Sequence, residues 1–223
     1  MQAVLERMTP AFVYDPTLVL YLPLRQLDSA TFADRSAYGH LVTRSGAVWQ
    51  PQGTYFDGID DKINCGSLAA LALDQAFTLM MWVKLPIPIT ASWQSLLSYN
   101  RNGTNFYGLW KSSSPIFHFR WAYNVAGTLA MDFLTTISEG NWYHVVGTFN
   151  RSVPLAITYL NGLIDRTATP GLPTAAVGLL TIGENNIGSE DFTGQLDDIR
   201  IYSRALNPME IQRIYLETRG QYV

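Results

Sequence analysis

The sequence predicts an all-β protein, a two-sheet antiparallel sandwich with one short C-terminal helix. Aromatic residues make up 13% of the 223 residues, and together with frequent Val, Ile and Thr they suit pleated, half-buried surfaces. Short β-rich runs recur along the chain with turn signals between them, a pattern typical of sandwiches and barrels. Asn-Gly pairs at 102–103 and 161–162 indicate hairpin turns, because both residue types tolerate positive φ.

Thirteen β-rich runs are the predicted strands, a number that suits two packed sheets. In chain order they are Thr17–Leu24, Val48–Phe56, Asp61–Cys65, Phe77–Leu85, Trp93–Asn100, Tyr107–Lys111, Ile116–Tyr123, Thr128–Leu134, Trp142–Asn150, Leu155–Leu160, Leu163–Ala168, Leu179–Glu184 and Gly194–Tyr202.

One helix is predicted near the C-terminus. Asn207 can cap it, Pro208 suits the first helical position and Glu210 can complete a capping box, so the helix should run to about Glu217. Three apolar residues then recur at helical spacing and would pack the helix onto the sandwich: Ile211, Ile214 and Tyr215.

Composition predicts one domain and excludes several classes of partner. Hydrophobic residues make up 48% of the chain and charged residues 15%, which suits a packed core and not a disordered chain. Residues 1–16 are assigned to an N-terminal arm and residues 17–223 to the sandwich domain. A net charge of −3, with 15 scattered Lys and Arg residues, offers no basic surface for nucleic acid. The arm has neither a signal-peptide core nor a membrane span, so we expect no secretory signal in this chain and no membrane insertion.

Four segments, in order and suitably separated, resemble the laminin-G-like jelly roll of the concanavalin A-like lectin/glucanase superfamily. They are Phe56–Asp61, Phe77–Lys84, Asn141–Phe149 leading to Tyr159–Gly162, and Leu180–Gly183 leading to Gly194–Leu206. The resemblance covers about residues 17–217. It implies a jelly-roll sandwich, in which we expect the following residues to face inward: Trp82, Val83, Val145 and either Ile199 or Ile201.

The acidic residues do not predict a glycosidase. The glucanase branch of the superfamily carries a Glu-x-Asp-x-Glu motif, or a near variant of it, on one strand, and this chain has no such triplet. Its acidic pairs are adjacent residues, which point to opposite faces of a strand: Asp60 and Asp61, Glu190 and Asp191, and Asp197 and Asp198. We therefore predict a protein without a catalytic residue, and a structural or surface role for His144.

Two kinds of ligand are expected. Because many members of the family carry a calcium ion, the resemblance implies one structural calcium ion, with Asp197 as the first side-chain ligand and with the Gly58 carbonyl and Asp57 as weaker candidates. In the alternative, which stays open, Asp197 pairs with Arg200 or accepts backbone amides. For a glycan, the central third of the chain offers aromatic and polar side chains, from which we select three glycan-binding candidates: Trp110, Trp121 and Arg101.

Two functions fit these observations. In the first, the sandwich is a binding or assembly protein, a decoration or fibre subunit on a virion surface, joined to other subunits through apolar residues of the arm such as Phe12 and Tyr14. In the second, it is a glycan-binding adhesion or targeting module. The expected location is accordingly a virion or an extracellular surface. A glycoside hydrolase is the least favoured function.

Overall fold

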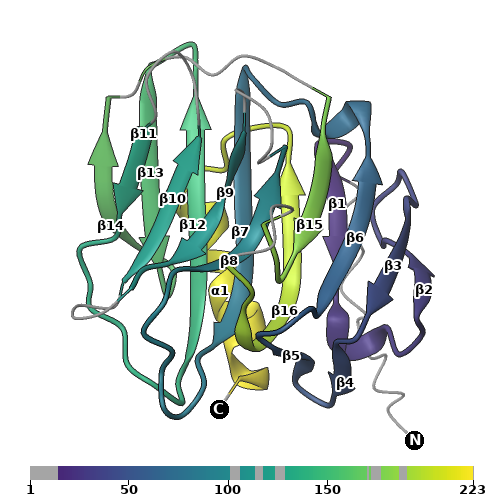
Figure 1. The fold of residues 1–223 in the computed structure, drawn as a ribbon. Coiled ribbons are helices and arrows are strands. Elements are labelled where there is room, and N and C mark those ends of the chain that lie inside the picture. The colour runs from purple at the N-terminus through teal and green to yellow at the C-terminus, as the bar shows by residue number, and fades with distance from the viewer. Residues whose placement is uncertain are drawn as a thin grey trace, which may run out of the picture.

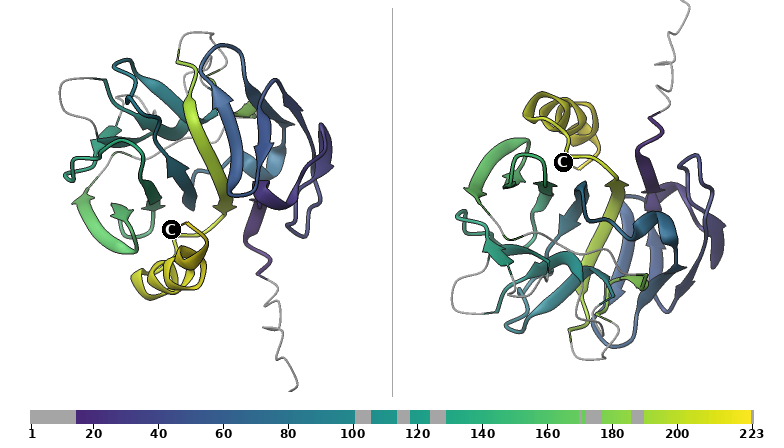
Figure 2. Two further views of the ribbon diagram at one scale, coloured as in Figure 1. Left: turned by 90° about the horizontal axis from the view of Figure 1, so that it is seen from below. Right: turned by 90° about the horizontal axis from the view of Figure 1, so that it is seen from above.

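The computed structural model describes residues 15–100, 106–113, 118–123, 129–169, 171, 177–185 and 190–222. These residues form two antiparallel eight-stranded sheets that pack face to face, with one α-helix outside them (Figures 1 and 2). The predicted all-β sandwich with a C-terminal helix is confirmed.

The first sheet has the strand order β14-β13-β12-β7-β16-β5-β4, and β1 also pairs with β16. Its strands are β1 Leu18–Leu22, β4 Val48–Gln50, β5 Gly53–Asp57, β7 Ala76–Lys84, β12 Trp142–Asn150, β13 Leu155–Leu160, β14 Leu163–Ala168 and β16 Thr193–Tyr202.

The second sheet has the strand order β11-β10-β9-β8-β15-β6-β3-β2. Its strands are β2 Thr31–Ala33, β3 Leu41–Ser45, β6 Lys62–Ser67, β8 Gln94–Tyr99, β9 Tyr107–Lys111, β10 Phe119–Tyr123, β11 Leu129–Asp132 and β15 Leu179–Ile182. Three short 3-10 helices complete the described elements: η1 Leu24–Gln26, η2 Ala69–Leu71 and η3 Arg219–Gln221.

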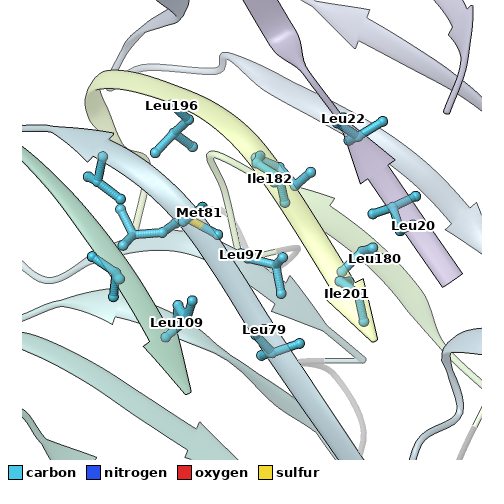
Figure 3. Close-up of a cluster of buried hydrophobic side chains, with 14 of the residues drawn as sticks. Leu20, Leu22, Leu79, Met81, Leu97, Leu109, Leu180, Ile182, Leu196 and Ile201 are labelled. Carbon is cyan, nitrogen blue, oxygen red and sulfur yellow. The ribbon is translucent and has the colours of Figure 1, made fainter. Parts of the chain in front are cut away.

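The core lies between the sheets, where alternate residues of each strand meet. Figure 3 shows part of this layer, with side chains contributed by β1, β7, β8, β9, β15 and β16. Val83, Val145, Ile199 and Ile201 belong to this buried cluster, as predicted. Ile199 can face inward like Leu196 because β16 bulges between Asp197 and Arg200, which shifts the alternation by one residue.

Trp82 was predicted to face the interior, and this is wrong. It follows directly on the inward Met81 and precedes the inward Val83, so strand alternation turns it to the outer face of the first sheet. There it is buried under the C-terminal segment, stacked on Tyr222 at 4.1 Å and on Tyr215 at 5.7 Å between ring centroids.

The C-terminal helix α1, Pro208–Thr218, forms as predicted. Its capping box is complete, since the Asn207 side chain accepts the Glu210 amide and the Glu210 carboxylate accepts the Asn207 amide. Ile211 and Ile214 pack in a second buried cluster, which lies between the helix and the outer face of the first sheet. No helix in the described part of the chain is both long and apolar enough to cross a membrane.

The strand predictions fail in two places. The run Val48–Phe56 is a hairpin, β4 and β5, that turns between Gln50 and Gly53. The short strands β2 and β3 were not predicted, because each buries only one residue, Phe32 in β2 and Val42 in β3, and the rest are half-buried or exposed. Of the two Asn-Gly turns, Asn161-Gly162 is confirmed with positive φ at both residues, and residues 102–103 lie outside the described residues.

Candidate functional site

A row of four residues crosses the outer face of the second sheet from β8 to β11. Trp110 lies opposite Ser95 on one side and opposite Arg120 on the other, and Arg120 lies opposite Asp132. Residues paired in this way share a face, with Cβ atoms about 5 Å apart. The row faces outward because the residues that alternate with it, among them Leu109, Trp121 and Met131, fill the core.

Arg120 and Asp132 form a two-pronged ion pair at the centre of this face. The Arg120 Nη2 donates to Asp132 Oδ2 at 2.8 Å, and its Nε donates to Oδ1. These hydrogen bonds hold the pKa of the Asp132 carboxyl below its usual range. His118 Nε2 also lies 3.3 Å from Asp132 Oδ1, so a protonated His118 would join the ion pair.

Trp93 covers Arg120 from the loop that precedes β8. The guanidinium carbon of Arg120 lies 4.3 Å from the centre of the Trp93 ring, a close cation–π contact. The Trp93 side chain is half-buried, and the side chains of Arg120 and Asp132 are 31% and 33% exposed. Solvent therefore reaches an aromatic ring and a charged hydrogen-bonding pair at the same place, which we call the Trp93–Arg120–Asp132 cluster.

Trp110 continues the row toward the loop after β15. Its indole Nε1 donates to Glu190 Oε2 at 2.9 Å. The ring lies over Gly108, where an added Cβ would come within 2.6 Å of it, so glycine is needed beneath the indole. Trp110 is only 5% exposed, and it therefore supports the cluster more than it offers a stacking surface.

A second polar group lies on the outer face of the first sheet. The Asp197 carboxylate is completely buried and accepts four hydrogen bonds, from the backbone amides of Arg25 and Asp198, from Arg25 Nη1 at 2.6 Å and from the Tyr222 hydroxyl at 2.8 Å. Burial raises the pKa of Asp197, and the Arg25 charge opposes this effect. This arrangement ties η1 and the chain end to β16.

A laminin-G family model, described as the concanavalin A-like lectin/glucanases superfamily, matches residues 57–212. The chain belongs to this superfamily. A curated relative is the adhesion G-protein coupled receptor V1 of Danio rerio, 28% identical over an alignment of 155 residues; the match covers 62% of this chain and 2% of the receptor. The chain thus spans a very small part of that relative.

Solved structures show the same laminin-G-like fold. Domain 4 of AbnA, an extracellular arabinanase of Geobacillus stearothermophilus in complex with arabinotriose, is 16% identical with a TM-score of 0.66, covering 89% of this chain and 98% of that one. A structure of botulinum neurotoxin type C, whose cell entry depends upon interaction with two ganglioside molecules, is 15% identical with a TM-score of 0.71, covering 90% of this chain and 51% of that one.

One of the three predicted glycan-binding residues of this laminin-G-like domain, Trp110, lies beside the cluster. Trp121 is a core residue with no exposed surface, packed against Gly147 and Phe77, so the prediction that it binds a glycan is wrong. Arg101 lies outside the described residues. The prediction missed Arg120 and Asp132, which lie opposite each other on the neighbouring strands β10 and β11.

The predicted metal ligands of the domain do not come together. Asp197 lies beside Gly53, and Asp57 lies at the other end of β5, about 13 Å away along the strand. Asp197 accepts two backbone amides, as the alternative stated, but it pairs with Arg25, whereas the Arg200 named there pairs with Asp198 at 2.8 Å. Asp57 ends β5 and Gly58 follows it, at the start of a loop where three acidic residues have carboxylate oxygens within 4.8 Å of one another: Asp57, Asp60 and Asp61.

The remaining predicted residues concern the arm and His144. Phe12 and Tyr14 lie outside the described residues. Asp15, the first described residue, is held to the domain by Arg204 at 2.8 Å. His144 is buried beside Trp82, and burial lowers its pKa from 6.5 to about 3, as suits a structural histidine that stays neutral.

Proposed function

We propose that this laminin-G-like domain is a non-catalytic glycan-binding module that acts at an extracellular or particle surface, with the Trp93–Arg120–Asp132 cluster as its binding site. The observation that carries the proposal is the partial exposure of a tryptophan ring directly above a fixed Arg–Asp pair. Such a combination suits sugars, because pyranose rings stack their C–H faces on aromatic rings while their hydroxyls bond planar charged groups.

The local geometry supports recognition by a preformed site. Asp132 fixes the Arg120 side chain through two hydrogen bonds, and Trp93 packs on the same guanidinium, so little side-chain freedom remains to be lost on binding. A sugar hydroxyl can donate to the accessible lone pairs of Asp132 and accept from the N–H groups of Arg120 that Asp132 leaves unused.

The relatives favour binding over catalysis. AbnA domain 4 was solved with arabinotriose, and botulinum neurotoxin type C depends on gangliosides, so domains of this fold take part in sugar-dependent proteins. Within the described residues, Asp197 and Asp198 are each engaged by an arginine, and the Glu190 carboxylate accepts the Trp110 indole N–H. These carboxylates therefore serve as structural acceptors in our proposal, and none is assigned the work of a general acid or nucleophile.

A glycan array tests the proposal, followed by isothermal titration calorimetry with each glycan that binds. We expect Trp93→Ala and Arg120→Ala each to weaken binding at least about tenfold. Trp49→Ala is the matched control, because Trp49 is also half-buried but lies on β4 of the other sheet. Equal loss in the control, or unchanged affinity in both site variants with native melting temperatures, would place the sugar elsewhere.

Assembly into a virion or another particle remains a second proposal, supported by the apolar residues of the arm, among them Phe12 and Tyr14. Its test is deletion of residues 1–14, which leaves the Asp15–Arg204 ion pair in place. The assembly function predicts a folded domain that no longer joins its particle. A truncated protein that still assembles, or that does not fold, would count against it.

A further inference from the structure

We infer that the proposed site selects neutral sugars over sialylated, uronic or sulfated ones. The inference deepens the proposed function and rests on it. It comes from the charge balance of the Trp93–Arg120–Asp132 cluster, in which the one arginine at the centre is already matched by a carboxylate.

Proteins recognise carboxylate and sulfate groups best with an arginine whose two parallel N–H groups are free. At Arg120 the Nε and Nη2 atoms already donate to the two oxygens of Asp132, and Trp93 covers one face of the guanidinium at 4.3 Å, so only the Nη1–Nη2 edge is left for an anionic group. An anionic sugar would have to displace Asp132 from this arginine or bind beside it. In both positions it would meet the negative charge of Asp132, a carboxylate that is ionised at neutral pH.

Around the cluster, one acidic and one basic side chain lie at the two ends of the row, and His118 beside Asp132 carries a charge only when it is protonated. Glu190 lies at one end of the row, bonded to Trp110, and Arg166 lies at the other, where its Nη1 donates to the Asp132 carbonyl at 3.0 Å. Their opposite charges balance across the face. Lys111 is adjacent to Trp110 in sequence, but it is fully buried and its Nζ donates to three backbone carbonyls, so it cannot reach a ligand.

A neutral sugar meets none of this repulsion. Asp132 at 33% exposure can accept from a hydroxyl, and Arg120 at 31% exposure can donate to one, while the pair between them stays intact. The pair therefore supplies a donor and an acceptor at a fixed spacing, which matches the two roles of adjacent sugar hydroxyls.

The experiment uses the full chain on arrayed glycans printed in matched sets, each neutral oligosaccharide beside its sialylated and sulfated forms. Wild type is expected to bind the neutral member at least about tenfold more tightly. Asp132→Asn removes the compensating charge and should shift this ratio toward the acidic members by at least about tenfold. The matched control is Asp74→Asn, because Asp74 forms a similarly exposed pair with Arg151, at 29% and 33%, away from this face.

A salt titration keeps the inference testable if Asp132→Asn does not fold. Between about 0.05 M and about 0.5 M salt, wild-type affinity for its glycan should change by less than about twofold, since no net charge attracts the ligand. Tighter wild-type binding to acidic members, a steep salt dependence, or an unchanged ratio in folded Asp132→Asn overturns the inference while glycan binding stands. Absence of binding to every glycan overturns the proposed function, and the inference with it.

Discussion

Removal of Arg25 should destabilise the domain strongly, because it leaves the buried Asp197 carboxylate without its balancing charge. The Asp197 side chain has no exposed surface, and Arg25 Nη1 lies 2.6 Å from its Oδ2. Breaking a buried pair from one side typically costs about 3–5 kcal/mol. Asp197 keeps three other donors, so the expected loss for Arg25→Met is at the lower end, about 3 kcal/mol, which lowers the melting temperature by about 6–12 °C.

The control is Arg213→Met on the exposed side of α1. Arg213 pairs with Glu217 at 2.7 Å, but the two side chains are 73% and 58% exposed, so solvent screens the pair and the melting temperature should hardly change. Adding Asp197→Asn to Arg25→Met should recover stability, since the amide removes the uncompensated charge and keeps an acceptor for the two backbone amides.

The loss of stability caused by Arg25→Met should also depend on pH. A carboxyl whose pKa rises on folding binds more protons in the folded than in the unfolded state, so its contribution to stability falls as pH rises above its unfolded pKa of about 3.9. Burial already raises the pKa of Asp197, and loss of Arg25 removes the charge that opposes the rise. The difference between Arg25→Met and wild type, measured by urea denaturation, should therefore grow from pH 4 to pH 7. A constant difference, or one as small as in the control, would refute the buried-charge argument.

Three further predictions concern other buried or clustered groups. Because the pKa of His144 falls on folding from 6.5 to about 3, the unfolded state binds one more proton than the folded state in this range. The free energy of unfolding should therefore fall by about 1.4 kcal/mol per pH unit below about pH 6.5, and His144→Phe should show a shallower dependence of this free energy on pH. Lys111→Met should lower the free energy of unfolding by about 2 kcal/mol, because Lys111 donates to the carbonyls of Thr90 and Ser92 just before Trp93. The same change should weaken glycan binding through Trp93, and unchanged glycan affinity would contradict this. The calcium prediction now rests on the loop of Asp57: calcium should raise the melting temperature, chelator should reverse the rise, and Asp57→Asn should abolish it.

Much of the fold could be predicted because its strands carry strong local patterns. The bounds of β9, β12, β13 and β14 match the sequence prediction residue for residue. The failures have physical causes. Trp82 was assigned inward for its size, although strand alternation places it on the face of the sheet opposite to that of Val83. Its burial depends on Tyr215 and Tyr222 from the far end of the chain. A sequence pattern reports which residues prefer burial, but the element that buries an outer-face side chain is decided by tertiary packing.

The candidate site also has a part that the sequence could predict and a part that it could not. Arg120 and Asp132 could have been suspected as a cross-strand pair from the sequence, because they have opposite charges and lie in two consecutive predicted strands, although the register that places them opposite each other comes from the structure. The position of Trp93 could not, since it depends on how the loop between β7 and β8 turns back over β10. That dependence makes Trp93 the most informative residue of the cluster: a sheet fixes the Arg–Asp pair, whereas only a correctly held loop places an aromatic ring above it.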